Sequence, residues 1–311
     1  MSSMRQPLPV SMDNLPDRVR IWEVGPRDGL QNEACVIDTD TKIAFIDRLT
    51  DAGLPVVEAT SFVRADRIPQ LADGPKVMAG ITRRPGTRYP VLVPNEKGLD
   101  AALAADARDI AVFASATQTF AERNLGRTLV TQMQMFAPVL DRARTEQIPI
   151  RGYVSMCFGD PWEGFVDAAQ VVDVCVELAD RGCSDVSLGD TIGVATPGQV
   201  RKLIDMLVAA HIDIERIGVH FHDTYGQALA NTLAALQSGV STVDASAGGL
   251  GGCPYALSAT GNLATEDLVW MLDGLGVETG VDLEKLTATS LWLADYLGKP
   301  VQSRVTRALL H

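Results

Sequence analysis

Eight short apolar or β-branched runs, spread along all 311 residues, decide which folds are open to this chain. The runs are residues 19–24, 55–60, 89–94, 109–115, 150–155, 185–190, 217–222 and 242–247. Segments with helical periodicity lie between most of them, for example residues 40–53, 168–182, 196–211 and 225–239. Strands that alternate with helices pair in parallel, and eight of them at this chain length predict a closed (β/α)8 TIM barrel. An open, doubly wound sheet is the alternative, although no GxGxxG motif follows the first run.

The remaining segments indicate how the chain is organised around this barrel. Residues 1–17 contain three prolines and little periodicity, so we expect a flexible N-terminal arm there. Helical patterns at residues 262–273 and 282–297 predict additional C-terminal helices from about residue 262. No linker or low-complexity segment marks a second domain, so residues 18–311 are expected to form a single TIM-barrel catalytic domain.

Composition narrows the possible partners and the compartment. The formal net charge of −12 argues against nucleic acid as a partner, because few cations are available to neutralise phosphates. No apolar stretch has the length of a signal peptide or of a membrane span, so no membrane association is expected. The five cysteines are scattered without a CxxC pair, which favours reduced thiols. These features predict a soluble, cytoplasmic protein.

Polar residues lie at the ends of five of the predicted strands or directly after them. They are EVGPRDG (23–29), Glu58, GDT (189–191), HFHD (220–223) and GGLGGCPY (248–255). The carboxyl ends of barrel strands form one rim, and TIM-barrel active sites are built there. The sequence therefore predicts an active site on this rim.

His220 and His222 give the first indication of its chemistry. Positions i and i+2 of a strand share one face, so the two imidazoles project together while Phe221 points away. Two adjacent imidazoles can hold a metal ion. The alternative is a pair of polar side chains at a strand end that are satisfied by hydrogen bonds.

Five segments together resemble the hydroxymethylglutaryl-CoA lyase family of TIM-barrel metallolyases. They are EVGPRDGLQNE (23–33), SLGDTIG (187–193), HFHDTYGQALAN (220–231), GLGGCPYA (249–256) and GNLATEDLV (261–269). The similarity runs from about residue 18 to about residue 300, with similar spacing of the motifs. The RDG and HxH motifs are shared by a whole superfamily, whereas GLGGCPYA is characteristic of the lyase branch.

The resemblance implies a divalent cation, usually Mg²⁺ or Mn²⁺. Its ligands in the family correspond here to Asp28, His220, His222 and Asn262. Oxygen ligands mixed with imidazole suit such a cation and leave positions open for substrate oxygens.

The resemblance also implies the reaction, which is the retro-Claisen cleavage of 3-hydroxy-3-methylglutaryl-CoA to acetyl-CoA and acetoacetate. Arg27, which is always cationic, suits the thioester oxygen where negative charge develops. Asp28 and Glu58 are both candidates for the base that takes the C3 hydroxyl proton, and Glu58 is alternatively a residue that orients Arg27. Cys253, in a glycine-rich loop, is the candidate acid that protonates the enolate carbon.

Further positions resemble the substrate pocket of the family. They are Arg27, Gln31, Ser61, Arg151, Tyr153, Asp190 and Thr191. Each of them is equally suited to contact the side chains that bind metal or substrate and to hold those side chains in orientation. Asp223 is expected to accept a hydrogen bond from an imidazole N–H. The cysteines other than Cys253 are expected to pack in the interior, with Cys157 near the rim.

Other functions stay open. Ala247 and Gly248 replace the Val-Ala that is usual in the family, which leaves room for a longer branched 3-hydroxyacyl-CoA. A carboligase that runs the Claisen direction shares RDG and HxH, but the cysteine loop and the lack of a C-terminal regulatory domain disfavour it. A non-enzymatic barrel that binds metal or acyl-CoA is disfavoured by the joint presence of Arg27, Asp28, Glu58 and Cys253. A homodimer formed through the C-terminal helices is expected.

Overall fold

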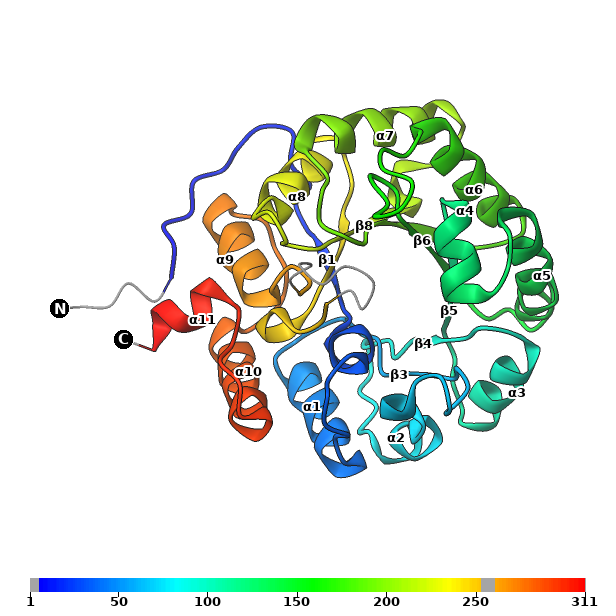
Figure 1. Ribbon diagram of the computed structural model, residues 1–311. Coiled ribbons are helices and arrows are strands. Elements are labelled where there is room, and N and C mark those ends of the chain that lie inside the picture. Colours follow the sequence, from blue (N-terminus) through cyan, green and yellow to red (C-terminus); the bar gives the residue numbers. More distant parts are fainter. Residues whose placement is uncertain (1–5, 253–260, 311) are drawn as a thin grey trace.

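The computed structural model describes residues 6–252 and 261–310. In this part of the chain, nine parallel strands form one sheet that curls into a ring, with helices around the outside (Figure 1). The strands are β1 (Arg20–Glu23), β2 (Val56–Val57), β3 (Thr60–Ser61), β4 (Val91–Leu92), β5 (Ile110–Ser115), β6 (Ile150–Ser155), β7 (Asp185–Asp190), β8 (Ile217–Phe221) and β9 (Thr242–Ala245). All eight predicted strands are confirmed at their predicted positions.

The ring closes because the two terminal strands of the sheet are one extended segment. The strand order is β2-β1-β9-β8-β7-β6-β5-β4-β3, and only Glu58 and Ala59 separate β2 from β3. The Glu58 N–H donates to the Glu23 carbonyl at 2.8 Å, on the β1 side. The Ala59 N–H donates to the Pro90 carbonyl at 2.9 Å, on the β4 side. The segment therefore serves as one barrel strand, and the predicted (β/α)8 fold is confirmed.

The helices follow the strands in alternation. Those around the ring are α1 (Thr39–Asp51), α2 (Gly74–Gly80), α3 (Glu96–Ala104), α5 (Leu129–Thr145), α6 (Ala168–Asp180), α7 (Pro197–Ala209), α8 (Ala228–Gln237) and α9 (Thr265–Leu275). Shorter helical turns lie in the loops, namely η1 (Gly25–Gly29), η2 (Pro69–Leu71), α4 (Gln118–Phe120), η3 (Ala121–Leu125), η4 (Ile214–Arg216) and η5 (Ala247–Gly249).

The C-terminal helices divide differently from the expectation. The helix expected over residues 262–273 is α9, which follows the last barrel strand and takes the eighth position in the ring (Figure 1). The additional helices are α10 (Leu283–Leu297) and α11 (Arg304–Leu309), which pack against α9 on the outside of the barrel. Before β1, residues 6–17 form no helix or strand, and Val10 N–H donates to the Gly274 carbonyl at 2.8 Å. No helix in the described ranges combines the length and the apolarity that crossing a bilayer requires.

Alternation along the strands separates two interiors. On β1, Ile21 belongs to the large aliphatic core between sheet and helices, whereas Trp22 points into the barrel. The barrel interior is partly charged, because the fully buried Arg151 stacks over the Trp22 ring at 4.1 Å. Buried charged groups need partners, so the interior of this barrel contains an ionic network in place of purely aliphatic layers.

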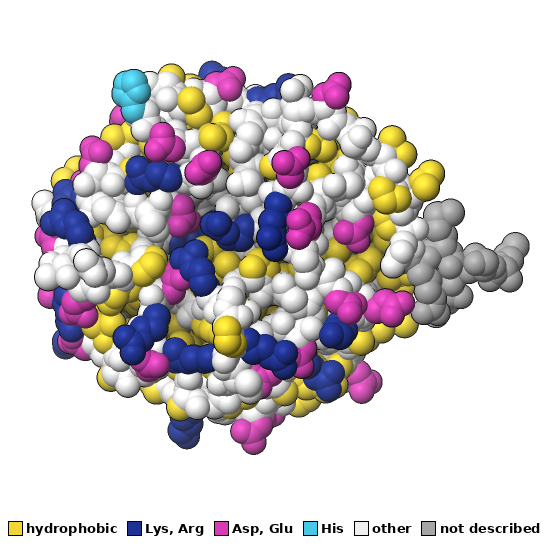
Figure 2. Space-filling model, turned by 180° about the vertical axis from the view of Figure 1, so that it is seen from behind, with side chains coloured by type: hydrophobic (Ala, Val, Ile, Leu, Met, Phe, Trp, Pro, Cys, Tyr) yellow, Lys and Arg dark blue, Asp and Glu magenta, His cyan; other side chains and the backbone are white. Residues whose placement is uncertain are grey.

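The two ends of the barrel differ in character. Figure 2 shows the face opposite to that of Figure 1, with basic side chains gathered near its middle and acidic ones around them. Arg20, Arg88, Arg108 and Arg216 lie at the starts of strands, and all are at least partly exposed. At the strands' other ends the polar side chains are buried, as Glu58, His220 and His222 illustrate. Burial of polar groups at one end marks that end as the place to look for a site.

Candidate active site

The turn η1, at the end of β1, projects two charged side chains over the barrel. Asp28 N–H and Gly29 N–H both donate to the Val24 carbonyl, at 2.8 and 3.1 Å, which winds the chain tightly. Gly25 is required there, because a Cβ at this position would stand 2.6 Å from Oε1 of Glu23. The turn leaves the Arg27 side chain buried and Asp28 partly exposed.

Arg27 is held by two carboxylates. Its Nε donates to Oε1 of Glu58 at 2.5 Å, and its Nη1 donates to Oδ1 of Asp28 at 2.6 Å. Although burial alone would lower the pKa of Arg27, the charges of Glu58 and Asp28 raise it well above its usual value. Nη2 has no hydrogen-bond acceptor among the described residues, so it is free to bind an incoming oxygen.

Glu58 is completely buried and uses both oxygens. Besides Arg27, it accepts a hydrogen bond from Nε1 of Trp22 at 3.0 Å and a short one from the hydroxyl of Tyr153. Burial and the neighbouring Glu58 charge raise the pKa of Tyr153 well above its usual value, so the phenol stays protonated as a donor. This geometry fits the residue that orients Arg27 better than it fits a base.

Asp28, His220 and His222 converge from η1 and the end of β8. One potential ligand atom from each side chain lies within 4.8 Å of the others. The imidazole centroids are 5.5 Å apart. Burial alone would raise the pKa of Asp28, but the charge of Arg27 and the two imidazoles lower it to about 2. The carboxylate is therefore ionised at any physiological pH, as a cation ligand must be.

Asn262 completes this cluster. Residue 262 forms an isolated β-bridge with His222, and its Nδ2 donates to Oδ2 of Asp28 at 2.9 Å. Its Oδ1 is buried and has no hydrogen-bond partner among the described residues. A buried, unsatisfied amide oxygen beside a carboxylate and two imidazoles is what a divalent cation would satisfy. The residues therefore fit the metal that the sequence suggested.

Behind the metal cluster, His220 has a carboxylate partner that the sequence did not indicate. Oδ2 of Asp244, on β9, lies 3.2 Å from Nδ1 of His220. The sequence favoured Asp223 as an imidazole partner. The structure instead pairs Asp223 with Arg304 at 2.7 Å and with the N–H of Ala228 at 3.1 Å.

The predicted substrate-pocket residues separate into two groups. Tyr153 joins the cluster through Glu58, Ser61 Oγ accepts from the N–H of Val63 at 3.1 Å, and Gln31 is partly exposed just beyond η1. Arg151, in contrast, is not brought to the rim. Its side chain has no exposed surface and pairs with Asp185 and Asp244 inside the barrel, so it cannot touch a substrate.

Asp190 and Thr191 hold loops. The two oxygens of Asp190 accept from the N–H groups of Val194 and Ala195, at 2.9 and 3.0 Å. Burial raises the pKa of Asp190 to about 6. Oγ1 of Thr191 accepts from the N–H of Met156 at 2.9 Å. These contacts place both residues in support of the β6 and β7 loops.

The predicted thiol acid, Cys253, lies outside the described residues. Of the other cysteines, Cys157, Cys175 and Cys183 are buried, and burial raises the pKa of each thiol. Cys35 is exposed. Packing is thus the role of the three buried thiols, because a thiol with a raised pKa is a poor nucleophile and acid at neutral pH.

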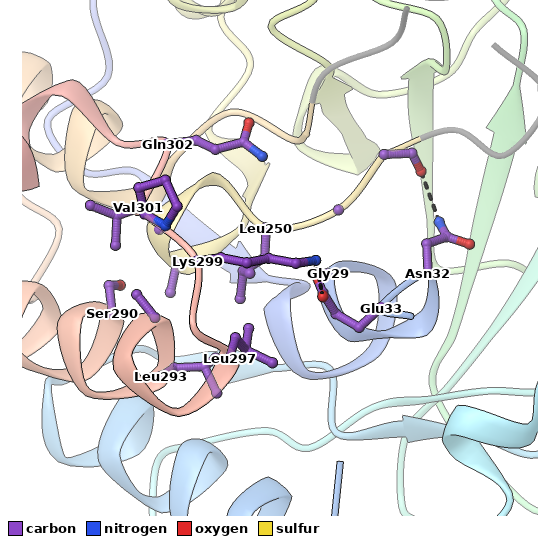
Figure 3. A pocket seen from close by; sticks show the side chains of 16 residues that line it. Gly29, Asn32, Glu33, Leu250, Ser290, Leu293, Leu297, Lys299, Val301 and Gln302 are labelled. Carbon is purple, nitrogen blue, oxygen red and sulfur yellow. Dashed lines mark hydrogen bonds and ion pairs between the residues drawn. The ribbon is translucent and has the colours of Figure 1, made fainter. Parts of the chain in front are cut away.

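A cavity of about 410 Å³ lies beside the cluster, between α10 and the loops after β1 and β9 (Figure 3). Its floor includes Ser290, Leu293 and Leu297 of α10. Lys299 reaches across its mouth to Glu33. The cavity touches the cluster at Gly29, next to Asp28, and at Gly251, where a Cβ would stand 2.5 Å from Nδ2 of Asn262.

Two buried carboxylates that the sequence did not single out as site residues anchor the turn η5, where the glycine-rich loop begins. Glu23 accepts from the N–H of Ala247 at 2.9 Å, and both oxygens of Glu266 lie 3.0 Å from the N–H of Gly248. Thr265 Oγ1 also donates to Glu23 at 2.6 Å. Burial raises the pKa of Glu23 and of Glu266 to about 7.

These shifted carboxyl groups predict a stability that falls as the pH rises. A carboxyl group whose pKa is higher in the folded than in the unfolded chain stabilises the fold at pH values below the unfolded pKa. This stabilisation is lost as the pH rises from the unfolded pKa through the folded pKa. As the pH rises from about 4.5 to 7, each of the two groups should lower the free energy of unfolding by roughly 3 kcal/mol. Urea unfolding of wild type and Glu266→Gln across this pH range checks this prediction. The free energy of unfolding of the variant should fall about half as much as that of wild type. Parallel curves for the two proteins would refute the assignment.

The fold and the polar cluster define this chain as a TIM-barrel protein with a candidate divalent-metal centre at the strand ends. The sequence profile of the HMGL-like family matches residues 18–292. The chain belongs to that family, which confirms the resemblance read from its motifs.

Relatives with names and structures agree with this placement. The mitochondrial hydroxymethylglutaryl-CoA lyase of Gallus gallus is 50% identical over 293 residues, which are 94% of this chain and 98% of that protein. The crystal structure of the hydroxymethylglutaryl-CoA lyase from Pseudomonas aeruginosa matches with a TM-score of 0.93 and 48% identity, over 96% of this chain and 99% of that one. An HMG-CoA lyase from Acinetobacter baumannii, in complex with coenzyme A and 3-methylmalate, matches with a TM-score of 0.90 and 36% identity, over 96% and 97%.

Proposed function

We propose that this protein is a carbon–carbon lyase that cleaves 3-hydroxy-3-methylglutaryl-CoA to acetyl-CoA and acetoacetate with a divalent cation. The observation that carries the proposal is the position of Arg27, tied to Glu58, beside the cluster of Asp28, His220 and His222. The named hydroxymethylglutaryl-CoA lyases support the same reaction, because the chain covers nearly their whole length.

The reaction sets three tasks. The C3 hydroxyl gives up its proton. The electron pair left on oxygen forms the C3 carbonyl as the C2–C3 bond breaks, and the electron pair of that bond moves into the enolate of the acetyl thioester, whose oxygen carries the negative charge. A proton delivered to C2 completes acetyl-CoA. The site must therefore hold a base, a cationic donor for the enolate oxygen and an acid.

Arg27 is assigned to the enolate oxygen. Its Nε and Nη1 are committed to Glu58 and Asp28, so the guanidinium is fixed in orientation, and Nη2 remains as the donor. A donor that is already oriented costs no reorganisation when negative charge develops. Glu58 is assigned as a positioning residue for Arg27, with Tyr153 and Trp22 holding its second oxygen.

The cation is assigned to Asp28, His220, His222 and Asn262, with Mg²⁺ or Mn²⁺ expected. When bound, a divalent cation polarises the substrate oxygens and lowers the pKa of the C3 hydroxyl. Asp28 is also the candidate acceptor of the hydroxyl proton, because it is partly exposed whereas Glu58 is fully buried.

Cys253 is assigned as the acid that protonates the enolate carbon. The support comes from its neighbours, because Gly251 and Gly252 line the cavity beside the cluster. Nδ2 of Asn32 donates to the Gly252 carbonyl at 2.8 Å, so the start of the loop is tied to the segment after η1. A thiol is a suitable acid for carbon when a loop brings it to the enolate.

The cavity between α10 and the glycine-rich loop is proposed to take part of the acyl-CoA chain. It is largely apolar along α10 and adjoins the cluster at Gly29 and Gly251 (Figure 3). The complex of coenzyme A with the Acinetobacter baumannii lyase supports binding of an acyl-CoA by this fold. Lys299, at the mouth, is a cation that borders the cavity and is paired there with Glu33.

Filling the cavity should weaken substrate binding more than chemistry. Ala294, on α10, lines the cavity, so Ala294→Trp is expected to raise KM for the acyl-CoA at least about tenfold with kcat nearly unchanged. Ala288→Trp is the matched control, because Ala288 lies on the same helix and faces solvent. Steady-state kinetics on both variants check this, and an unchanged KM in Ala294→Trp would place the acyl-CoA elsewhere.

The compartment and the assembly are also part of the proposal. Curated relatives include both mitochondrial and cytoplasmic enzymes by name, and a cytoplasmic location is proposed here because five scattered cysteines without a CxxC pair suit a reducing compartment. A homodimer through α10 and α11 is supported by the exposed side chains of Tyr296 on α10 and of Leu310 directly after α11. Light scattering on the purified chain measures the assembly.

A comparison of substrates tests the choice of reaction. The acetyl-CoA formed from 3-hydroxy-3-methylglutaryl-CoA is compared with that from analogues with a longer branch, at equal concentrations. The proposal predicts the highest kcat/KM for the hydroxymethylglutaryl thioester. Preference for a longer branch would identify the chain-length variant instead, and net condensation of acetyl-CoA with 2-oxoacids would identify a carboligase.

A further inference from the structure

A line of charged groups, buried except for its partly exposed outer end, runs through the barrel to one member of the metal cluster. It begins at Asp185, at the start of β7, whose Oδ1 lies 3.1 Å from Nη1 of Arg151. Nη2 of Arg151 donates to Oδ1 of Asp244 at 2.6 Å. The other oxygen of Asp244, Oδ2, lies 3.2 Å from Nδ1 of His220 and accepts from Oγ of Ser187 at 3.0 Å.

The contact between Asp244 and His220 determines which imidazole nitrogen can bind a cation. An ionised carboxylate only accepts hydrogen bonds, so the nitrogen facing it must carry the hydrogen. In His220 that nitrogen is Nδ1, which leaves the lone pair of Nε2 for the side of the ring away from Asp244. The ring orientation is fixed by the same contact, because Asp244 is itself immobilised by Arg151 and Ser187.

We propose that Asp244 is a positioning residue that holds His220 as its Nδ1–H tautomer, with Nε2 directed at the cation site, and that Arg151 and Ser187 hold Asp244 in place. This gives a function to Arg151, which is too deeply buried to touch a substrate. The inference rests on the proposed metal centre and is independent of which acyl-CoA is cleaved.

Arg151 has a second carboxylate partner in Asp185, on the side away from His220. A variant of Asp185 therefore distinguishes a positioning role of Asp244 from that of a purely structural ion pair. Removing Asp185 disturbs the network without touching the imidazole contact, whereas removing Asp244 breaks that contact. Asp185→Asn is therefore a matched control for Asp244→Asn.

Nitrogen-15 NMR of the metal-free protein reads the tautomer directly. The chain has only four histidines, so long-range proton–nitrogen spectra at alkaline pH, where the imidazoles are neutral, can be assigned by single substitutions. We expect the His220 pattern of an Nδ1–H tautomer in wild type and in Asp185→Asn. In Asp244→Asn the amide can donate as well as accept, and a mixture of both tautomers is expected.

Binding of Mn²⁺ alone, followed by its paramagnetic resonance signal, gives the second readout. Asp244→Asn should weaken Mn²⁺ binding by about 10- to 100-fold, as removal of an outer-shell partner does, while Asp185→Asn stays within about twofold of wild type. If Asp244→Asn does not fold, the double variant Arg151→Met with Asp244→Asn, which removes both charges of the ion pair, is measured in its place.

The outcomes separate this inference from the proposed function. An Nε2–H tautomer in wild type, or unchanged tautomer and Mn²⁺ affinity in Asp244→Asn, would overturn the role of Asp244. The expected tautomers and Mn²⁺ affinities in a protein that does not cleave hydroxymethylglutaryl-CoA would uphold it and reject the proposed substrate. Equal weakening in Asp185→Asn and Asp244→Asn would reduce Asp244 to a general structural role.

Discussion

Replacement of Arg27 by glutamine is expected to lower kcat for acetyl-CoA release by about 10³-fold or more. Loss of a single preorganised donor to a developing oxyanion costs about 10²- to 10³-fold, and Arg27 contributes a full charge as well. Arg27→Lys should recover little of this activity. A lysine carries its three donors on one nitrogen, so it cannot place them at the separate positions of Nε, Nη1 and Nη2 of Arg27.

The control for Arg27 has to separate chemistry from folding. Arg27→Gln leaves Glu58 buried without its cationic partner, which by itself destabilises a protein. The double variant with Glu58→Gln removes both charges and should fold with the same low kcat. Arg88→Gln is a second control, since Arg88 stacks on Trp22 from the other end of the barrel and should keep nearly full activity. A folded Arg27→Gln protein with kcat within tenfold of wild type would rule out the assigned role.

His222→Ala is expected to abolish measurable turnover and to weaken Mn²⁺ binding by more than about 100-fold. Removal of a side chain that only supports a ligand already costs 10- to 100-fold, and His222 is assigned as a ligand itself. Titration of the metal-free variant with Mn²⁺ measures the affinity apart from the reaction.

His211 supplies the matched control for His222. It is exposed, lies between α7 and β8 and takes a positive φ of 66°, so His211→Asn is chosen because asparagine tolerates that conformation. The control should bind Mn²⁺ and turn over like wild type. Normal Mn²⁺ affinity in His222→Ala would place the cation elsewhere.

Much of the fold could be predicted because local patterns agree with the tertiary structure. The apolar runs at residues 150–155 and 185–190 coincide with β6 and β7 residue for residue. The second barrel strand is less regular. Its division into β2 and β3 follows from pairing with β1 on one side and β4 on the other, which no local pattern encodes. The boundary between an arm of residues 1–17 and the barrel stays a prediction.

The site could be predicted where a residue's position along its strand was plain. Asp28, His220 and His222 follow or end strands, and the structure brings them together. Arg151 and Tyr153 share one face of β6, but they stand about 7 Å apart along the strand at ~3.3 Å per residue. Tyr153 therefore reaches Glu58 near the rim, whereas Arg151 stays in the interior. Sharing a face does not mean sharing a height in the barrel.

Roles that depend on a partner far along the chain could not be predicted. Asp244 becomes a partner of His220 only because β8 and β9 are neighbours with His220 in register with residue 244.

Asp190 looked like a substrate contact, yet its oxygens are used by N–H groups of its own loop. The orientation of a carboxylate toward a loop or toward a pocket is set by packing that a linear pattern does not contain.

The release of acetyl-CoA from 3-hydroxy-3-methylglutaryl-CoA by protein stripped with EDTA, before and after addition of Mg²⁺ or Mn²⁺, decides whether this site is a metal-dependent lyase. Cys253→Ser is measured alongside. We predict no turnover in the stripped protein, recovery with either cation and a large loss of kcat in Cys253→Ser. Cleavage that persists without any cation, or no cleavage with any cation, would contradict the assignment of this site.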